Sequence, residues 1–139
     1  MSTPLHGELV IQLANLQAKI QKRLNGPLSL HGIGFTEYLV LRQLNQAPGH
    51  SLRRIDLAQE VGLSASGVTR VLNPMEKIGL VKKDHVVRDA RVRLVALTPV
   101  GENVLKEADT SFNQVAESLF TPIDSKKQEA LSGIVGALL

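Results

Sequence analysis

The stretch Leu57–Val71, with the sequence LAQEVGLSASGVTRV, predicts two short helices joined by a tight turn. Its apolar and small residues fall at the offsets that let two such helices cross closely, at Leu57, Ala58, Val61, Leu63, Val68 and Val71. A glycine such as Gly62 can take a left-handed backbone conformation at little steric cost, and Ser64 can cap the free amides of the second helix. These features predict a helix-turn-helix, a unit that commonly presents its second helix to DNA.

Two further helices are predicted before this unit. Apolar residues recur at helical spacing at Leu9, Leu13, Leu16, Ile20 and Leu24. They predict an amphipathic helix with a narrow apolar stripe, ending before Gly26-Pro27. A second helix is expected from an N-cap at Thr36 to about Ala47. Phe35 before that cap is expected to pack on Val40 as a hydrophobic staple. The run Tyr38–Leu41 also fits a buried strand, but Leu41 and Leu44 continue at helical spacing, which favours a helix.

A β-hairpin is predicted after the helix-turn-helix. His85–Val87 and Val92–Leu97 alternate as two strands around Arg88–Arg91, and together they form the kind of hairpin known as a wing. Ser51 is expected to cap the first helix of the helix-turn-helix.

Two helices are predicted after the hairpin. Thr98 as an N-cap and Pro99 at the first helical position open a long helix that stops before Pro122. Asp124 or Ser125 caps the last helix, and a glutamine three residues after Ser125 matches a capping box.

The composition excludes several classes of protein. A chain of 139 residues, 43% of them hydrophobic, is long enough for one domain with a packed core. No apolar run approaches the roughly 20 residues that span a bilayer, and the N-terminus lacks the pattern of a signal peptide. We therefore expect a cytoplasmic protein without membrane partners. The absence of cysteine excludes disulfides and thiolate metal sites. The histidines, which lack metal-ligand spacing, are His6, His31, His50 and His85.

The basic excess of the chain is concentrated in one segment. Residues 82–93 hold five basic and two acidic residues, so this segment carries the whole net charge of +3. Within it, Arg88, Arg91 and Arg93 are the predicted DNA contacts of the hairpin, suited to phosphates or to the minor groove. Asp89 is expected to pair with Arg91 or Arg93 and to fix the shape of the loop.

The helix after Ser64 has two chemically distinct faces. The apolar face consists of Val68, Val71, Leu72 and Met75. The polar face consists of Ser66, Thr69, Arg70, Asn73 and Lys77. Because Arg can bind guanine and Asn can bind adenine through paired hydrogen bonds, we predict that Ser64 and the polar face contact DNA.

These residues resemble the MarR family of bacterial and archaeal winged-helix regulators. The matching motifs are Asp56-Leu57-Ala58, Leu63-Ser64, Val68-Thr69-Arg70, Glu76 with Gly79-Leu80-Val81, Asp89 with Arg91, and Val95 with Leu97-Thr98 and Gly101. They span about a third of the chain, and the Asp-x-Arg wing followed by Leu-Thr-x-x-Gly is the most specific part. The resemblance implies a mainly α fold with a small β-hairpin wing, in which N- and C-terminal helices form a dimerisation region.

The resemblance also implies a homodimer that binds a pseudo-palindromic DNA operator. Residues 1–34 would supply a dimerisation helix and connection, residues 35–99 the DNA-binding lobe, and residues 100–139 the C-terminal dimerisation helices of one intertwined domain. The apolar stripe and the apolar C-terminus agree, because neither has an obvious partner in a compact winged helix. The alternative is a private core within one chain.

Regulation by a small aromatic or anionic effector is a further implication of the resemblance. Phe35, Tyr38 and Arg42 lie in the region between dimer helices and lobe where such compounds bind, although core packing explains the two aromatic residues equally well.

The predicted function is a sequence-specific transcriptional regulator, with repression favoured over activation and no cofactor. The alternative is a winged-helix module for protein–protein contact, but the polar face offers base-reading groups and no apolar anchor. An enzyme is not expected, because the chain has no cysteine nucleophile and no clustered His, Asp and Glu, and Ser64–Gly67 fits helix capping better than catalysis.

Overall fold

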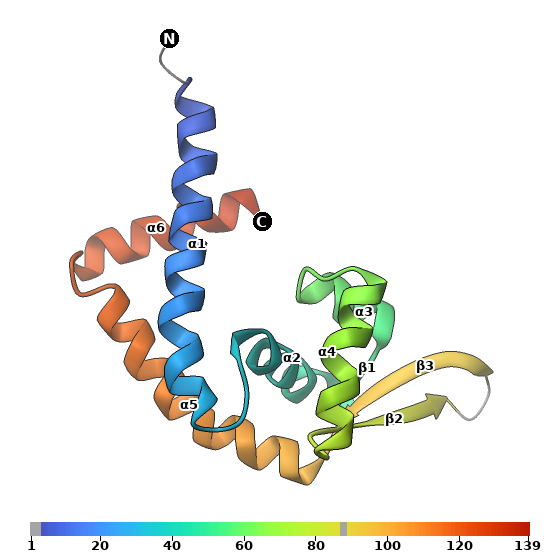
Figure 1. Cartoon of the computed structure of the whole chain (residues 1–139). Helices are drawn as coiled ribbons and strands as arrows, with labels where there is room; N and C mark the ends of the chain where they lie inside the picture. Colours follow the sequence, from blue (N-terminus) through green and yellow to red (C-terminus); the bar gives the residue numbers. More distant parts are fainter. Residues whose placement is uncertain (1–3, 87–88) are drawn as a thin grey trace.

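The computed structural model describes residues 4–86 and 89–139, with the side chains of residues 85–91 excepted. Its elements, in chain order, are α1 (Leu5–Ser29), α2 (Phe35–Gln46), a 3-10 turn (Pro48–His50), β1 (Ser51–Arg53), α3 (Arg54–Glu60), α4 (Ala65–Lys77), β2 (Val81–Val86), β3 (Asp89–Leu97), α5 (Pro99–Leu119) and α6 (Ser125–Leu138). The lobe formed by α2, α3, α4 and the sheet lies to one side of α1, and the β2–β3 hairpin projects from it (Figure 1). This is the predicted mainly α, winged helix-turn-helix fold.

The sheet has three antiparallel strands in the order β1-β3-β2. Ser51 lies in β1 opposite Ala96 of β3, so the prediction that Ser51 caps α3 was wrong. Arg53 occupies the N-cap of α3 and makes no side-chain cap bond. Pairing with a strand some forty residues downstream draws Ser51 away from the helix. Its hydroxyl is buried without a hydrogen-bond partner among the described residues.

The two wing strands are longer than predicted. β2 starts at Val81, and β3 already includes Asp89. Cross-strand pairing persists outward to Val86 opposite Asp89, past an irregularity at His85/Val86. The predicted loop residues Asp89 and Arg91 therefore belong to a strand.

The first helix passes through Gly26 and Pro27 instead of ending before them. A proline inside a helix removes one backbone hydrogen bond and crowds the carbonyl four residues earlier. Burial of the last turn outweighs that cost, because Leu28 is fully buried in the core.

The second helix starts at Phe35, with Gly34 at the N-cap, so the predicted cap at Thr36 was wrong. Asn25 of α1 supplies the missing acceptor, because its Oδ1 accepts a hydrogen bond from the Phe35 amide at 2.9 Å. Phe35 is thus the first helical residue and not the staple residue before a cap. Its ring stacks with Phe112 at a centroid distance of 6.3 Å.

Most of the other predicted turns and caps are confirmed, but one predicted capping box is not. Gly62 has a φ of +70°, which favours glycine at this turn. Ser64 and Thr98 each accept a hydrogen bond at 3.0 Å from the amide three residues later. Asp124, and not Ser125, caps α6. The capping box does not form, because the Gln128 side chain donates to the carbonyls of Phe120 and Ile123.

One core joins the lobe to α1 and α5. Its largest fully buried side chains are Leu24, Leu28, Val40, Leu41, Leu44, Leu57 and Met75. The first turn of α5 approaches the residue before β2 so closely that a Cβ on Gly101 would lie 2.1 Å from the Leu80 carbonyl oxygen. Only glycine fits this junction between the lobe and α5.

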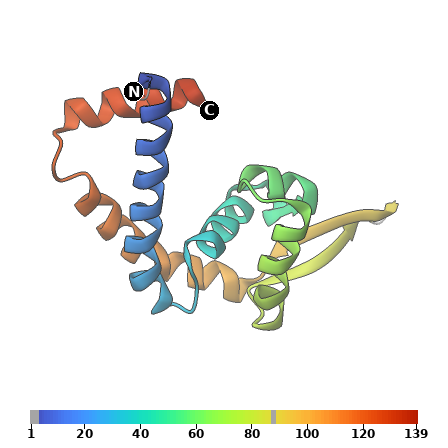
Figure 2. The same ribbon diagram turned by 45° about the horizontal axis from the view of Figure 1, so that its top comes forward.

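The end of the molecule away from the lobe is formed by the outer part of α1 and by α6. α1 extends well beyond the lobe, and α6 lies at this far end (Figure 2). None of the described helices is long and apolar enough to cross a membrane.

Candidate nucleic-acid interface

Helix α4 buries one face and exposes the other, as its sequence predicts. Val68, Leu72 and Met75 are each at most 3% exposed and hold the helix on the lobe. The residues predicted to contact DNA from this helix are all exposed, at Ser66, Thr69, Arg70, Asn73 and Lys77. Their donors therefore lie on a surface that a DNA groove can reach.

The N-terminus of α4 is fixed by its cap. The Ser64 hydroxyl accepts from the Gly67 amide and lies 3.2 Å from the Ser66 hydroxyl. Ser64 thus has a structural role as the cap of α4, in addition to its predicted DNA contact.

The wing supplies positive charge beside α4. Arg93 is exposed on β3. Lys83 on β2 reaches Glu76 of α4, with Nζ and Oε2 3.8 Å apart, which ties the wing to the helix. Arg88 lies outside the described residues, as do the side chains of Asp89 and Arg91, so the expected pairing of Asp89 stays a prediction.

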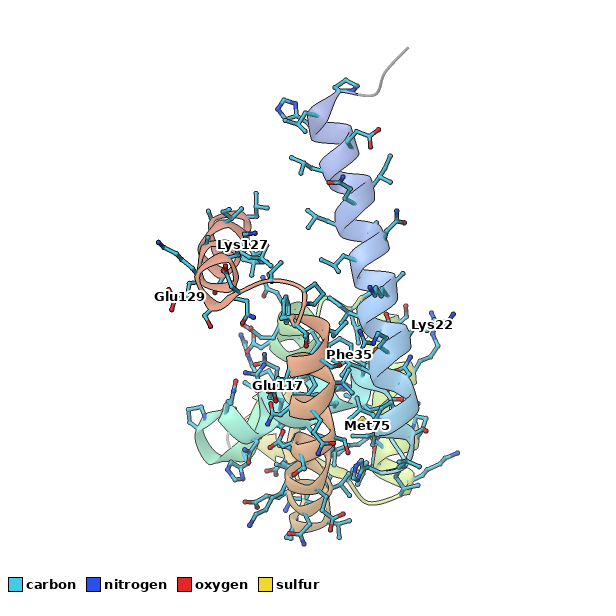
Figure 3. The ribbon with its side chains drawn as sticks, turned by 90° about the vertical axis from the view of Figure 1, so that its left-hand side faces the viewer. Lys22, Phe35, Met75, Glu117, Lys127 and Glu129 are labelled. Carbon is cyan, nitrogen blue, oxygen red and sulfur yellow. The ribbon has the colours of Figure 1, made fainter. Side chains whose placement is uncertain are left out.

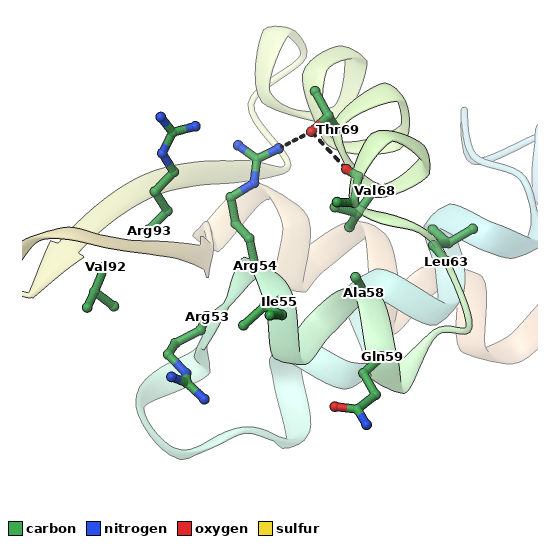
Figure 4. A pocket seen from close by; sticks show the side chains of 11 residues that line it. Arg53, Arg54, Ile55, Ala58, Gln59, Leu63, Val68, Thr69, Val92 and Arg93 are labelled. Atoms are coloured by element: carbon green, nitrogen blue, oxygen red, sulfur yellow. Dashed lines mark hydrogen bonds between the residues drawn. The ribbon is translucent and has the colours of Figure 1, made fainter.

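An open hollow of about 750 Å³ separates α4 from the wing. The apolar residues that line it include Ile55, Ala58, Val68 and Val92, and the basic residues that line it are Arg53, Arg54 and Arg93. Figure 4 shows Arg54 extending from α3 towards Thr69, while Arg53 turns to the opposite side. Arg54 and Arg93 therefore place positive charge between α4 and the wing.

Arg54 was not among the predicted DNA contacts, which were placed on the helix after Ser64 and in the basic segment 82–93. The signal was the Arg53-Arg54 pair directly before the helix-turn-helix. Arg54 donates from Nη2 to the Thr69 hydroxyl at 2.9 Å.

Arg53, by contrast, is an exposed residue paired within its own turn. It donates from Nε and Nη2 to Asp56 at 2.8 and 3.1 Å. These hydrogen bonds raise the pKa of Arg53 and lower the pKa of Asp56. The charge of Arg53 is therefore already balanced by a neighbour.

The residues predicted to contact an effector separate into two environments. Tyr38 is buried, stacks on Phe112 at 4.6 Å, and donates from its hydroxyl to Asp109 Oδ1 at 2.5 Å. Burial, followed by the Asp109 interaction, raises the pKa of Tyr38 well above its ordinary range. Phe35 also stacks with Phe112, so that these three rings form an aromatic cluster, whereas Arg42 is exposed. The two aromatic residues thus serve the core, and an effector role stays a prediction.

Apolar side chains cover the end of the molecule remote from the wing. On α1 they are 43% to 71% exposed, at Leu5, Leu9, Val10, Ile11, Leu13 and Leu16. On α6 the exposed residues include Ile134 and Leu138. Figure 3 shows α6 standing apart from the outer half of α1, so these side chains do not cover one another. The predicted alternative of a private core for this surface has no support here.

No group of three or more described His, Asp or Glu side chains is arranged to hold a metal ion.

Comparison with known proteins places this arrangement in a family. The model of the MarR family matches residues 35–92, which span the helix-turn-helix and most of the wing. The chain is 25% identical over 125 residues to the transcriptional repressor MprA of Escherichia coli K12, covering 90% of this chain and 71% of MprA.

Solved structures share the fold. Sco3205, a MarR family regulator from Streptomyces coelicolor solved in complex with DNA, superposes with a TM-score of 0.87 at 20% identity, covering 99% of this chain and 88% of Sco3205. NadR in complex with 4-hydroxyphenylacetate superposes with a TM-score of 0.81 at 20% identity, covering 99% of this chain and 96% of NadR. The family match, the matching motifs and the fold agree that residues 35–92 form a MarR family domain, and the relatives matched over most of the chain are transcriptional regulators.

Proposed function

We propose that this protein represses transcription by binding a pseudo-palindromic DNA operator as a homodimer. The observation that carries the proposal is the division of α4: its apolar face is buried in the lobe, and its polar face is exposed beside a basic wing. A surface of Arg, Asn, Thr and Ser on a helix of this kind suits the major groove. The complex of Sco3205 with DNA supports the same use of the fold.

Each element has a distinct part in binding. Arg70 and Asn73, near the centre of the exposed face of α4, read base edges. Arg93, with Arg88 and Arg91, grips phosphates or the minor groove and sets the register of the lobe on the duplex. The bound dimer then blocks polymerase at the operator, in the cytoplasm where the chromosome lies.

The homodimer is supported by the apolar residues of α1 and α6. Large exposed apolar patches mark interaction surfaces, and a two-fold dimer matches the symmetry of an inverted repeat. A second copy of α1 and α6 is the partner of matching chemistry for this surface.

Release by a small aromatic or anionic effector completes the proposal. The complex of NadR with 4-hydroxyphenylacetate is the supporting parallel. In this chain Arg42, exposed on α2 next to the Tyr38 cluster, is the cation available to such a compound. Binding there would act by favouring one spacing of the two lobes over another.

The test is selection of bound duplexes from a random pool by the purified protein at near-physiological salt. Enrichment of an inverted repeat is the expected result. A failure to enrich any sequence, with binding that only decays as salt rises, would contradict the proposal and favour protein–protein contact in its place.

A further inference from the structure

Arg54 lies between the recognition helix and the wing. It is the first residue of α3 and is half-buried. Its side chain lines the 750 Å³ hollow towards α4 and also a second hollow of about 260 Å³ towards β2 and β3, shared with Lys83 and Arg93. Arg54, like Arg93, therefore borders both hollows, and it does so from α3, between the two elements that the proposed function places on DNA.

Thr69 holds the Arg54 side chain in place. The Thr69 hydroxyl accepts from Arg54 Nη2 at 2.9 Å and donates its own proton to the Ala65 carbonyl at 3.1 Å. A hydroxyl has one proton to donate, so Thr69 has no donor left for a base. The guanidinium carries five N–H donors, and most of those on Arg54 have no acceptor among the side chains that the structure describes.

Arg54 shares the second hollow with Asp84 as well as with Lys83 and Arg93, but it belongs to no ion pair found among the described side chains. The ion pairs among the described side chains join Arg53 to Asp56 and Lys83 to Glu76. Arg54 takes part in neither. Arg93 and Arg54 extend towards the same side of the molecule in Figure 4, which concentrates positive charge on that side.

The geometry of DNA identifies what would face this charge. When a recognition helix enters the major groove and a wing enters the adjacent minor groove, the strand between the two grooves is a sugar-phosphate backbone. We infer that Arg54 is a phosphate contact on that strand and that Thr69 is the positioning residue that orients it, rather than a reader of bases. This inference rests on the proposed function and names a contact within it.

The contact has a defined signature, because phosphates carry no sequence information. Loss of one phosphate contact lowers affinity for operator and random duplex alike. It also flattens the dependence of log K on log salt by about 0.9. The ratio of wild-type to variant affinity then shrinks by about 3-fold between 50 and 200 mM salt.

The experiment measures this salt slope for the full-length wild type, Arg54→Ala and Arg54→Gln, on the selected operator and on a random duplex. Arg53→Ala is the matched control, because it removes the same charge at the neighbouring position. The Arg53 side chain points away from Arg54 and is paired with Asp56. Thermal melting verifies that each variant is folded. The expected result is a slope flatter by about 0.9 for both Arg54 variants and an unchanged slope for Arg53→Ala.

Variants of Thr69 test the positioning role. Thr69→Val removes the hydroxyl at nearly constant shape and is expected to flatten the slope partly, whereas Thr69→Ser keeps the hydroxyl and is expected to restore the wild-type slope. A role of Thr69 in helix stability alone would leave every slope unchanged.

Two outcomes overturn the inference: an unchanged slope for Arg54→Ala and Arg54→Gln, or equal flattening for Arg53→Ala. In either case a wild type that still prefers the operator leaves the proposed function intact. Failure of the wild type to prefer any sequence is the separate result that defeats the proposed function.

Discussion

Leucines of the DNA-binding lobe and leucines of the outer half of α1 lie in opposite environments. Leu41 and Leu44 of α2 are fully buried, whereas Leu9 and Leu13 of α1 are each 45% exposed. The residue type is the same, and both sets recur at helical spacing. The difference teaches that the lobe completes its own core within one chain, while α1 leaves an apolar surface exposed, as the proposed dimer requires.

The largest expected effect lies in the core of the lobe. Leu44→Ala removes a fully buried side chain and should lower the free energy of unfolding by about 2–5 kcal/mol, because it leaves a cavity. Chemical denaturation measures it. Leu30→Ala, at a position 85% exposed, is the control and should change stability by less than about 0.5 kcal/mol. Equal losses in both variants would remove the contrast between core and surface.

The second effect lies in the apolar surface of α1. Leu13→Asp should raise the dissociation constant of the dimer by about 100-fold, because it places a charge where a leucine would be buried against the partner. Sedimentation velocity at several protein concentrations measures it. Ile78→Asp, at an exposed apolar position of the lobe, should leave the dimer intact. If both variants dimerise as the wild type does, α1 is not the interface.

A third effect separates base reading from general affinity. Arg70→Ala should weaken operator binding by about 1–3 kcal/mol if the side chain reads a guanine. Binding to a random duplex, measured by competition, should change much less. Equal losses on the two duplexes would mean that Arg70 contacts only the backbone.

The smallest effect concerns a cap inside the lobe. Ser64→Ala should lower the free energy of unfolding by about 1 kcal/mol, because the Gly67 amide loses its acceptor. Ser66→Ala, two residues away and exposed, serves as the comparison and should have a smaller effect on the same denaturation curve. Similar losses for the two serines would show that the cap is not the source of the stability.

Local chemistry explains why much of the fold could be predicted. The glycine at position 62 and the caps at Ser64 and Thr98 depend on residues within three or four positions, and the structure has them as expected. The two faces of α4 follow from helical spacing alone.

Features that depend on distant partners could not be predicted. β1 is three residues long and exists because Leu52 pairs with Val95. The start of α2 depends on an acceptor from α1, and the continuation of α1 through Pro27 depends on burial of Leu28. Tertiary contacts decided each boundary.

In the candidate site, too, features set by local sequence could be predicted and features set by distant partners could not. Its exposed polar residues on α4 were predicted from spacing, but the bond between Arg54 and Thr69 joins two helices across fifteen positions and left no local pattern. The wing segment 82–93 has several basic residues close together in the sequence, whereas Arg54 lies outside that segment.

The central claim is that two copies of this lobe, joined through α1 and α6, read one inverted repeat. The most direct test inserts five base pairs, about half a helical turn, between the half-sites of the selected operator and measures affinity. One turn spans about 34 Å, so the insertion rotates one half-site to the opposite face of the duplex. The account predicts that affinity falls towards that for random DNA. Unchanged affinity would contradict it, because each lobe would then be binding on its own.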